Sequence, residues 1–344
     1  MSTKKVTIKQ VAQEAAVSIQ TVSRVINDRP DVADSTRRSV QAVIDRLGYQ
    51  PNAIARSLIR KRSHTLGVVA ADLALYGPMR GLSGIEQEST YLGYSLILRL
   101  VNQLDTDNGE QALSDLLARQ VDGIVWAIPE IDDNRVWLRD RIDHLSIPIV
   151  FLGPSPNDAS PPISASQIGG RMAAAHLRTQ GYQHIGLITG PLAFLAARDR
   201  QRGWQEIVSD SEPTRIFNGD WSAASGEYGL KQLLQQYPQL DAVYASNDQM
   251  ALGVLLAAHQ LGRRVPEDLG VVGTDNIPES AYFWPPLTTI QLHMIERSRQ
   301  AVRELSGKIE TGQDNRTTSQ TGNINLEPKL IIRHSSVLDH GRDQ

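Results

Sequence analysis

The sequence predicts a small helical N-terminal head and a hinge helix, followed by a larger α/β body with two lobes. Apolar residues recur at helical spacing over the first fifty residues. From Leu66 onward, continuous apolar runs typical of buried parallel strands alternate with amphipathic helices. One Pro/Ser-rich stretch, 154–164, interrupts the alternation. Two successive βαβ series separated by such a loop indicate two doubly wound parallel sheets.

The head contains a predicted pair of short helices with a tight turn between them, over 7–27. Ser18 stands where its hydroxyl can cap the second helix. Val17 and Val22 match a hydrophobic staple, which fixes the angle at which the chain enters that helix. This arrangement leaves a set of side chains facing outward on the second helix: Ile19, Gln20, Ser23, Arg24 and Asn27.

These outward side chains have the chemistry of a helix that binds in the DNA major groove. Glutamine pairs bidentately with adenine, arginine pairs with guanine, and isoleucine can cover a thymine methyl group. The alternative is two amphipathic helices packed in any α-helical domain. A third helix is predicted from about Asp34 to the stop at Gly48. Arg37 and Arg38 lie in its first turn, where a phosphate or the Asp34 carboxylate would offset the unfavourable helix dipole.

A short segment over 52–59 is the predicted hinge helix, with Asn52 as its cap. About eight residues are too few for a stable isolated helix, so we expect it to form against DNA. Leu58 would then enter a minor-groove step, and Arg56 and Arg60 would meet phosphates. The alternative is a flexible tether with incidental leucines.

The body is predicted to alternate strands and helices along its length. The expected strands are 66–71, 94–101, 122–128, 147–153, 184–190, 214–220, 241–246 and 269–274. The expected helices are 79–92, 107–119, 133–144, 166–179, 195–208, 223–236 and 248–261. Ligands bind such sheets at the carboxyl ends of the strands, and two lobes place those ends on a shared cleft.

Composition limits the classes of partner and chemistry. The chain has 344 residues and no cysteine, which excludes disulfides, thiolate nucleophiles and cysteine metal sites. Residues 1–62 hold 12 Lys and Arg against 5 Asp and Glu, whereas 63–344 hold 23 against 33. The basic head indicates a polyanion partner for that part alone. Without a signal peptide or a run of ~18 apolar residues, we expect a cytoplasmic protein with no membrane partner.

Polar side chains that follow the predicted strand ends are the candidate ligand contacts: Arg198, Trp221, Asn247, Asp248, Asp275 and Asn276. Guanidinium, carboxylate and carboxamide groups can hydrogen-bond adjacent hydroxyls, and an indole can cover a sugar ring. Structural alternatives exist for each. Asp248 is expected to cap its helix, Trp221 could belong to the core, and Arg198 could pair with Asp199 or Glu206.

Motifs of the common enzyme classes do not occur. The sequence has no GxGxxG after the first strand, no GxxxxGK[ST], no HExxH and no GxSxG. The eight histidines lack metal-ligand spacing. We therefore expect no enzyme, no cofactor and no metal site, and a small-molecule effector instead.

Motifs across nearly the whole chain resemble the LacI/GalR family of transcriptional repressors. The head carries VAQEAAVSIQTVSRVIN and TRRSVQAVIDRLGYQPN, and the body carries SNDQMALG, GVVGTDN and PPLTTI. The resemblance implies a two-lobed body like that of periplasmic binding proteins. It also implies a homodimer that binds a near-palindromic double-stranded DNA operator through two recognition helices.

The resemblance also implies roles for single residues. Base contacts fall on Ile19, Gln20 and Arg24, and contacts to the DNA backbone fall on Thr21, Ser23 and Asn27. The hinge-helix leucine of the family falls on Leu58, with Ala55 and Asn52 beside it. The family's sugar contacts fall on Arg198, Trp221, Asn247 and Asp275.

Several positions depart from the family pattern. Ala16 replaces the frequent glycine of the helix-turn-helix turn, and Ala33 replaces the serine that caps the third helix, so that Asp34 would cap instead. In the cleft, Gly153 replaces a sugar-binding aspartate and Leu292 replaces a glutamine. The tail after Leu330 lacks a leucine heptad run, so we expect a dimer and no tetramer.

Together these features predict a repressor of a sugar-utilisation operon that a sugar inducer, favoured as a galactoside, releases from its operator. A ligand that acts as corepressor and a non-regulatory sugar-binding protein are the alternatives. The expected domains are 1–51 for DNA binding, 52–63 for the hinge, and 64–344 for effector binding and dimerisation. Within the last, the N-lobe is expected over about 64–163 and 292–322, and the C-lobe over about 164–291 and 323–335.

Overall fold

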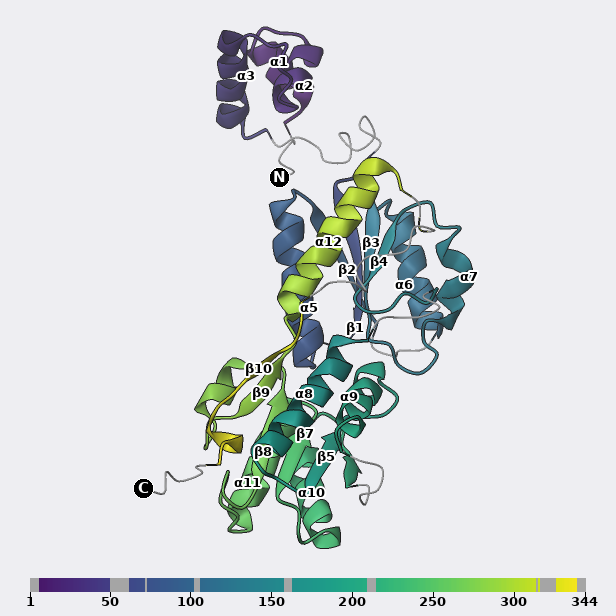
Figure 1. Ribbon diagram of the computed structural model, residues 1–344. Coiled ribbons are helices and arrows are strands. Elements are labelled where there is room, and N and C mark those ends of the chain that lie inside the picture. Colours follow the sequence, from purple (N-terminus) through teal and green to yellow (C-terminus); the bar gives the residue numbers. More distant parts are fainter. Residues whose placement is uncertain are drawn as a thin grey trace, which may run out of the picture. The chain divides into compact units, whose positions relative to one another are not determined.

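A computed structural model describes residues 6–49, 62–71, 73–101, 106–157, 163–208, 215–313, 315 and 326–338. The chain forms two compact units, Met1–Ser63 and His64–Gln344 (Figure 1). We call the first the head and the second the body, and each is built around its own apolar core.

The head consists of three helices, α1 (Ile8–Glu14), α2 (Ile19–Ile26) and α3 (Asp34–Leu47). Their apolar faces meet in one small core: Val11, Ala12, Val22, Val25, Val40, Val43 and Ile44. The predicted cap of α2 is confirmed, because the Ser18 hydroxyl accepts a hydrogen bond from the Thr21 backbone N–H at 3.1 Å. Gly48 ends α3 in the left-handed conformation, as predicted.

Two departures from the family pattern have direct structural consequences in the head. Ala16 adopts a φ of 54°, a left-handed conformation that disfavours any side chain with a Cβ atom. The prediction that Asp34 caps α3 is wrong. The N-cap is Ala33, which makes no side-chain hydrogen bond, and Asp34 is the first helical residue. The Asp34 carboxylate at this position still interacts favourably with the positive end of the α3 helix dipole.

The first lobe of the body is a four-stranded parallel sheet in the order β2-β1-β3-β4. The strands are β1 (Thr65–Ala71), β2 (Ser95–Val101), β3 (Gly123–Ala127) and β4 (Ile149–Phe151). Helices α5 (Tyr76–Tyr91) and α12 (Met294–Thr311) pack on one face, and α6 (Thr106–Ala118) and α7 (Arg139–Ile142) pack on the other (Figure 1). Strands β1, β3 and β4 are therefore buried on both faces, which explains their continuous apolar runs, whereas the edge strand β2 stays partly exposed.

The second lobe is a six-stranded sheet in the order β10-β9-β8-β7-β5-β6, in which only β10 runs antiparallel. Its strands are β5 (Ile185–Thr189), β6 (Ile216–Asn218), β7 (Ala242–Ala245), β8 (Gly270–Thr274), β9 (Thr288–Gln291) and β10 (Lys329–Ile331). Its helices are α8 (Ala165–Thr179), α9 (Leu195–Gln205), α10 (Ala223–Gln236) and α11 (Asp248–Gln260). Helices α8 and α9 cover one face and α10 and α11 the other.

The helices on each face approach closely where a glycine removes the side chain. A Cβ atom added at Gly203 of α9 would lie far inside van der Waals contact with the Gln167 carbonyl oxygen of α8. This close contact fixes the position of α9 against α8, and side chains of α9 reach the carboxyl end of the sheet. Backbone packing therefore sets where the polar side chains of the site lie.

The sequence-based element list differs from the structure in three places, and the first is that it lacks strands β9 and β10. The helix predicted over 133–144 is broken into a turn, a 3-10 helix at Val136–Leu138 and a short α7 at Arg139–Ile142. Helix α12 was not among the expected elements, although it returns the chain from the second lobe to pack against α5 of the first. In the described ranges, no helix is long and apolar enough to cross a membrane.

Candidate functional site

The outer face of α2 in the head presents side chains that the fold leaves open. Ile19 is 47% exposed although it is apolar, and Gln20 and Arg24 are also exposed. Arg24 lies 3.6 Å from Asp31, with both side chains 56% exposed. An exposed pair of this kind contributes little stability, so a DNA group can replace the carboxylate at small cost.

The three other predicted DNA-contact residues of the head are partly buried. The Thr21 hydroxyl lies 2.9 Å from the Ser18 hydroxyl at the start of α2. The Asn27 side-chain amide donates to the Ser23 carbonyl oxygen at 2.7 Å at its end. These contacts hold the ends of the helix, and the predicted role of Thr21, Ser23 and Asn27 at the DNA backbone stays a prediction.

Arg37, at the start of α3, has a structural partner. Its guanidinium donates to the Asp28 carboxylate at 2.6 Å and to the Arg29 carbonyl oxygen at 2.5 Å. Asp28 and not Asp34 therefore supplies the counter-charge. The predicted hinge residues Asn52, Ala55, Arg56, Leu58 and Arg60 lie outside the described residues.

In the body, a cavity of about 240 Å³ lies at the carboxyl ends of strands from both lobes. Most of its wall is apolar and includes Phe151, Phe194, Leu292 and Met294. The two lobes join beside it, where the Leu195 N–H donates to the Glu130 carbonyl oxygen at 2.9 Å. We call this cavity the cleft. A mostly apolar pocket with a few polar groups is the usual form of a small-molecule site.

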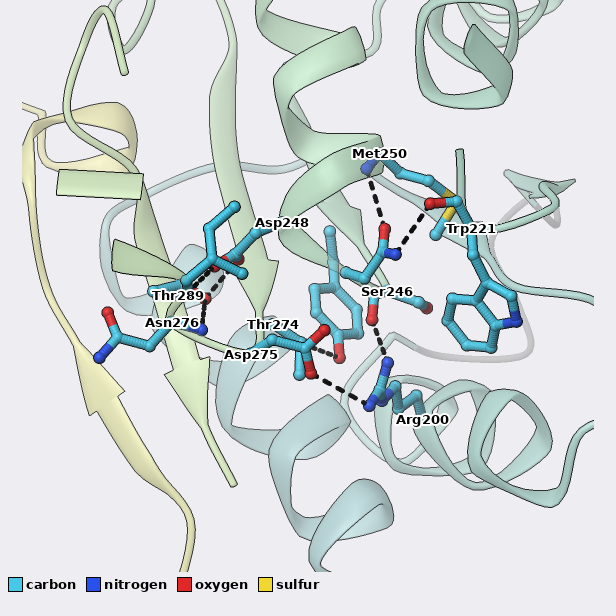
Figure 2. Close-up of polar contacts among 12 residues, drawn as sticks. Arg200, Trp221, Ser246, Asp248, Met250, Thr274, Asp275, Asn276 and Thr289 are labelled. Atoms are coloured by element: carbon cyan, nitrogen blue, oxygen red, sulfur yellow. Dashed lines mark hydrogen bonds and ion pairs between the residues drawn. The ribbon is translucent and has the colours of Figure 1, made fainter. Parts of the chain in front are cut away.

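Arg200 of α9 and Asp275 after β8 form the polar centre of the cleft (Figure 2). Their nearest charged atoms lie 3.7 Å apart, and the guanidinium also donates to the Ser246 carbonyl oxygen. The guanidinium stands 5.4 Å from the centre of the Trp221 ring, a cation–π contact. Burial raises the pKa of the Asp275 carboxyl to about 6, although the positive charge of Arg200 opposes the rise.

Asn247 and Asp248 do not have the roles that the sequence suggests. Asp248 was expected to cap α11, and this prediction is wrong because the Asn247 side chain accepts the Met250 N–H at 2.9 Å. Asp248 is instead buried and accepts hydrogen bonds from the Thr289 hydroxyl at 2.5 Å and the Ile277 N–H at 2.8 Å. Burial raises the pKa of Asp248 well above its usual range, and the charge of nearby Asp275 adds to the rise.

Of the four predicted effector contacts, Asp275 lines the cleft, whereas Arg198, Trp221 and Asn247 are not among its lining residues. The Arg198 guanidinium donates to the carbonyl oxygens of Leu192 and Ala193, and lies 3.7 Å from the Asp132 carboxylate, not from Asp199 or Glu206. Trp221 stacks under Arg200, and the Asn247 amide donates to the Trp221 carbonyl oxygen at 2.9 Å. Trp221 and Asn247 therefore hold Arg200 in place.

Arg200 lines the cleft although it was not predicted from the sequence. Two further arginines that were not predicted, Arg135 and Arg297, also line it. Arg135 donates to the Pro154 carbonyl oxygen at 3.0 Å, and burial lowers its pKa to about 10. Neither arginine follows a predicted strand end, so the sequence carried no signal for them. Gly153 and Leu292, the two departures from the family's cleft, both line the cavity.

Comparisons with known proteins agree with this architecture. Residues 7–52 match the family described as bacterial regulatory proteins, lacI family, and residues 174–336 match the periplasmic binding protein-like domain. The lactose operon repressor of Escherichia coli K12 is 36% identical over 293 residues, which cover 84% of this chain and 80% of that protein. The ribose operon repressor of Halalkalibacterium halodurans is 31% identical, over 96% of this chain and 97% of that one.

Relatives named PurR and solved structures give the same result. The transcriptional repressor PurR of Mannheimia succiniciproducens is 33% identical over 96% of this chain and 98% of its own length. The lac repressor dimer bound to operator and the anti-inducer ONPF superposes with a TM-score of 0.84 at 32% identity, covering 97% of this chain and all of that one.

The identities, the coverage and the fold lead to one conclusion. Both units of the chain have counterparts in the same order in these relatives, which the family description places among bacterial regulatory proteins. The chain therefore belongs to the LacI family of DNA-binding transcriptional repressors.

Proposed function

We propose that this chain is an effector-controlled repressor of a sugar-utilisation operon, and that a sugar bound in the cleft, favoured as a galactoside, releases it from its operator. The observation that carries the proposal is the outer face of α2, where Ile19, Gln20 and Arg24 are exposed in the pattern of base-reading side chains. The basic composition of residues 1–62 adds phosphate attraction, which makes the affinity salt-dependent.

A homodimer would present two such helices to a near-palindromic operator. Exposed apolar side chains on the second lobe support self-association, since large exposed apolar groups commonly mark interfaces. Tyr282 is 89% exposed and Trp284 is 91% exposed, and Leu252 and Leu256 protrude from α11. The similar lac repressor structure is a dimer on its operator.

The ligand class rests on the cleft and on the relatives. Arg200 and Asp275 offer a fixed donor and acceptor for neighbouring hydroxyls, and Trp221 supports them. Relatives include repressors named for lactose and ribose operons, and a similar regulator structure contains cellobiose. A sugar is therefore the ligand that the site chemistry and the relatives support together.

Induction needs only a modest coupling free energy. A hundredfold loss of operator affinity corresponds to about 2.7 kcal/mol of differential ligand binding between the two states. A rigid-body shift of the lobes on ligand binding is sufficient to supply such a difference.

A gel shift on a lac-like palindrome tests the proposal, with and without a panel of galactosides and glucosides. We expect the full chain to retard the fragment and one sugar to release it. Tighter operator binding with ligand would show a corepressor instead. Failure to bind both this palindrome and any DNA selected from random sequence would overturn the proposal.

A further inference from the structure

The charges that line the cleft are paired with one exception. Each of its three carboxylates lies near an arginine: Glu130 is 3.8 Å from Arg135, Asp275 is 3.7 Å from Arg200, and Asp199 is 3.2 Å from Arg202. Asp199 also accepts a hydrogen bond from the Ser164 hydroxyl at 2.6 Å. Arg297 is the cleft-lining arginine that is paired with none of these three carboxylates.

Arg297 lies in the first turn of α12, and its guanidinium forms no hydrogen bond or ion pair with any residue that the structure describes. The side chain is half-buried, and desolvation lowers the pKa of the guanidinium. A cation near a helix N-terminus is also disfavoured by the helix dipole. Without a counter-charge, this arrangement opposes folding, whereas a bound anion would reverse both unfavourable effects.

Ser298, the next residue of α12, adds an unused hydrogen-bond donor to the same wall. Its side chain is fully buried, and its hydroxyl has no hydrogen-bond partner among the residues described. The hydroxyl lies beside Gly81 of α5, where an added Cβ atom would be 3.2 Å from it, and both residues line the cleft. Buried hydroxyls normally have a partner, so a ligand is a natural candidate for this one.

The other residues that line the cleft favour a ligand that carries a charged group in addition to a sugar ring. Gly153 and Leu292 offer no side-chain polar atom at two positions of the cleft. Phe151, Phe194 and Met294 make the surroundings apolar, which strengthens any charge pair formed inside. Among the described residues that line the cleft, the first lobe thus offers few groups for neutral hydroxyls, and Arg297 is its cation without a paired carboxylate.

We infer that the effector bears an oxyanion, a carboxylate or a phosphate, that the Arg297 guanidinium and the Ser298 hydroxyl bind together. Guanidinium matches both groups because its planar fork can donate two parallel hydrogen bonds. The inference rests on the proposed function, since it narrows the ligand of that cleft to a sugar acid or a sugar phosphate.

Isothermal titration of the full chain without DNA tests the inference. The probes are galactose, galacturonate and galactose 6-phosphate, the three corresponding glucose compounds, and inorganic phosphate. The variants are Arg297→Leu, which removes the charge, and Arg297→Lys, which keeps it without the fork. Arg178→Leu is the matched control, because Arg178 lies on α8 outside the cleft and donates to the Gln183 carbonyl oxygen.

We expect an acid or phosphate sugar to bind at least about tenfold more tightly than its neutral parent, and Arg297→Leu to abolish this preference. The neutral sugar should bind both proteins alike, Arg297→Lys should retain part of the preference, and Arg178→Leu should retain all of it. Carboxylate and phosphate are distinguished by which compound binds.

The inference is overturned if the anionic sugars bind no better than their neutral parents, if Arg297→Leu keeps the preference, or if no oxyanion binds, inorganic phosphate included. Because DNA is absent, these outcomes do not depend on the operator. An anion that binds through Arg297 without changing operator affinity would uphold this inference and contradict the proposed function.

Discussion

On α2 of the head, Ile19, Gln20 and Arg24 extend into solvent, whereas in the body Arg200 and Asp275 contact each other and the protein around them. The difference follows from the partner that each surface receives. DNA brings its own donors, acceptors and phosphates, so a reading helix must keep its side chains unengaged. A small ligand brings few groups, so its site gains affinity when the protein holds its polar groups in place beforehand.

Replacement of Gly203 by alanine should give the largest effect, because the fixed geometry of the cleft depends on backbone packing. The new Cβ atom would overlap the Gln167 carbonyl oxygen and push α9, with Arg200, away from α8. We expect the body to lose about 3 kcal/mol or more of unfolding free energy, measured by urea unfolding with tryptophan fluorescence.

Gly307→Ala is the matched control for that substitution. No atom lies within 4 Å of a Cβ at this helical position, so alanine should stabilise the body by about 0.5–1 kcal/mol. Equal stability of the two variants would show that α8 and α9 do not hold the cleft as described.

The pH dependence of stability should reveal the buried carboxyl of Asp275. Its pKa is about 6 in the folded body and about 3.9 in an unfolded chain, so the folded state binds the proton more tightly. The free energy of unfolding should therefore fall as pH rises from about 4 to about 6, by up to about 3 kcal/mol.

Asp275→Asn should remove this part of the slope, since asparagine does not titrate. Urea unfolding of both proteins between about pH 4.5 and 7.5 measures the difference. Asp248 remains in both proteins, but the substitution removes the Asp275 charge that helps to raise the Asp248 pKa, so any part of the slope due to Asp248 should shrink as well. Parallel stability curves would mean that Asp275 is not desolvated in the folded body.

Arg24→Ala tests the open surface of the head. Loss of a base contact should cost about 1–3 kcal/mol of operator binding and relax discrimination at one base pair. Its ion pair with Asp31 is exposed, so stability should change by less than about 0.5 kcal/mol. Fluorescence anisotropy on a set of single-base operator variants measures both affinity and discrimination.

Arg46→Ala provides the control with the same loss of charge. Arg46 is exposed on α3 and pairs with Glu14 at 2.5 Å, away from the outer face of α2. We expect this variant to keep its base preferences. If both variants lost affinity equally and kept all discrimination, the assignment of Arg24 as a base reader would be wrong.

The smallest effect is expected at the turn of the head. Ala16→Gly should raise the stability of the head by about 1 kcal/mol, because glycine adopts the left-handed conformation without strain. Ala15→Gly, at a right-handed position one residue earlier, should lower it. Thermal unfolding followed by circular dichroism measures both, and a destabilised Ala16→Gly variant would refute the strain at this turn.

Local signals predicted most of the head and the succession of strands along the body from β1 to β8. Ser18 and Gly48 were identifiable because capping depends on neighbours within one turn of helix. That Arg200 lines the cleft, and not the predicted Arg198, was not identifiable from the sequence. The two residues are two positions apart on α9, which places them on nearly opposite sides of the helix, and periodicity alone does not orient a mostly polar helix.

The groups that the sequence missed depend on contacts between distant segments. Asn247 and Asp248 are adjacent in the chain, and only the position of Thr289 makes Asp248 a buried acceptor instead of a cap. Arg297 became notable because the other cleft-lining arginines are paired, Arg200 with the distant Asp275 and Arg135 with the nearby Glu130. Such absences of a partner cannot be predicted from spacing.

The most direct test of the central claim is the reciprocity between operator and cleft. The affinity of the releasing sugar is measured by isothermal titration with and without saturating operator. The account predicts that operator weakens sugar binding by the same factor by which the sugar weakens operator binding. Sugar affinity that is unchanged by the operator would contradict it, because a ligand with equal affinity for both states cannot control DNA binding.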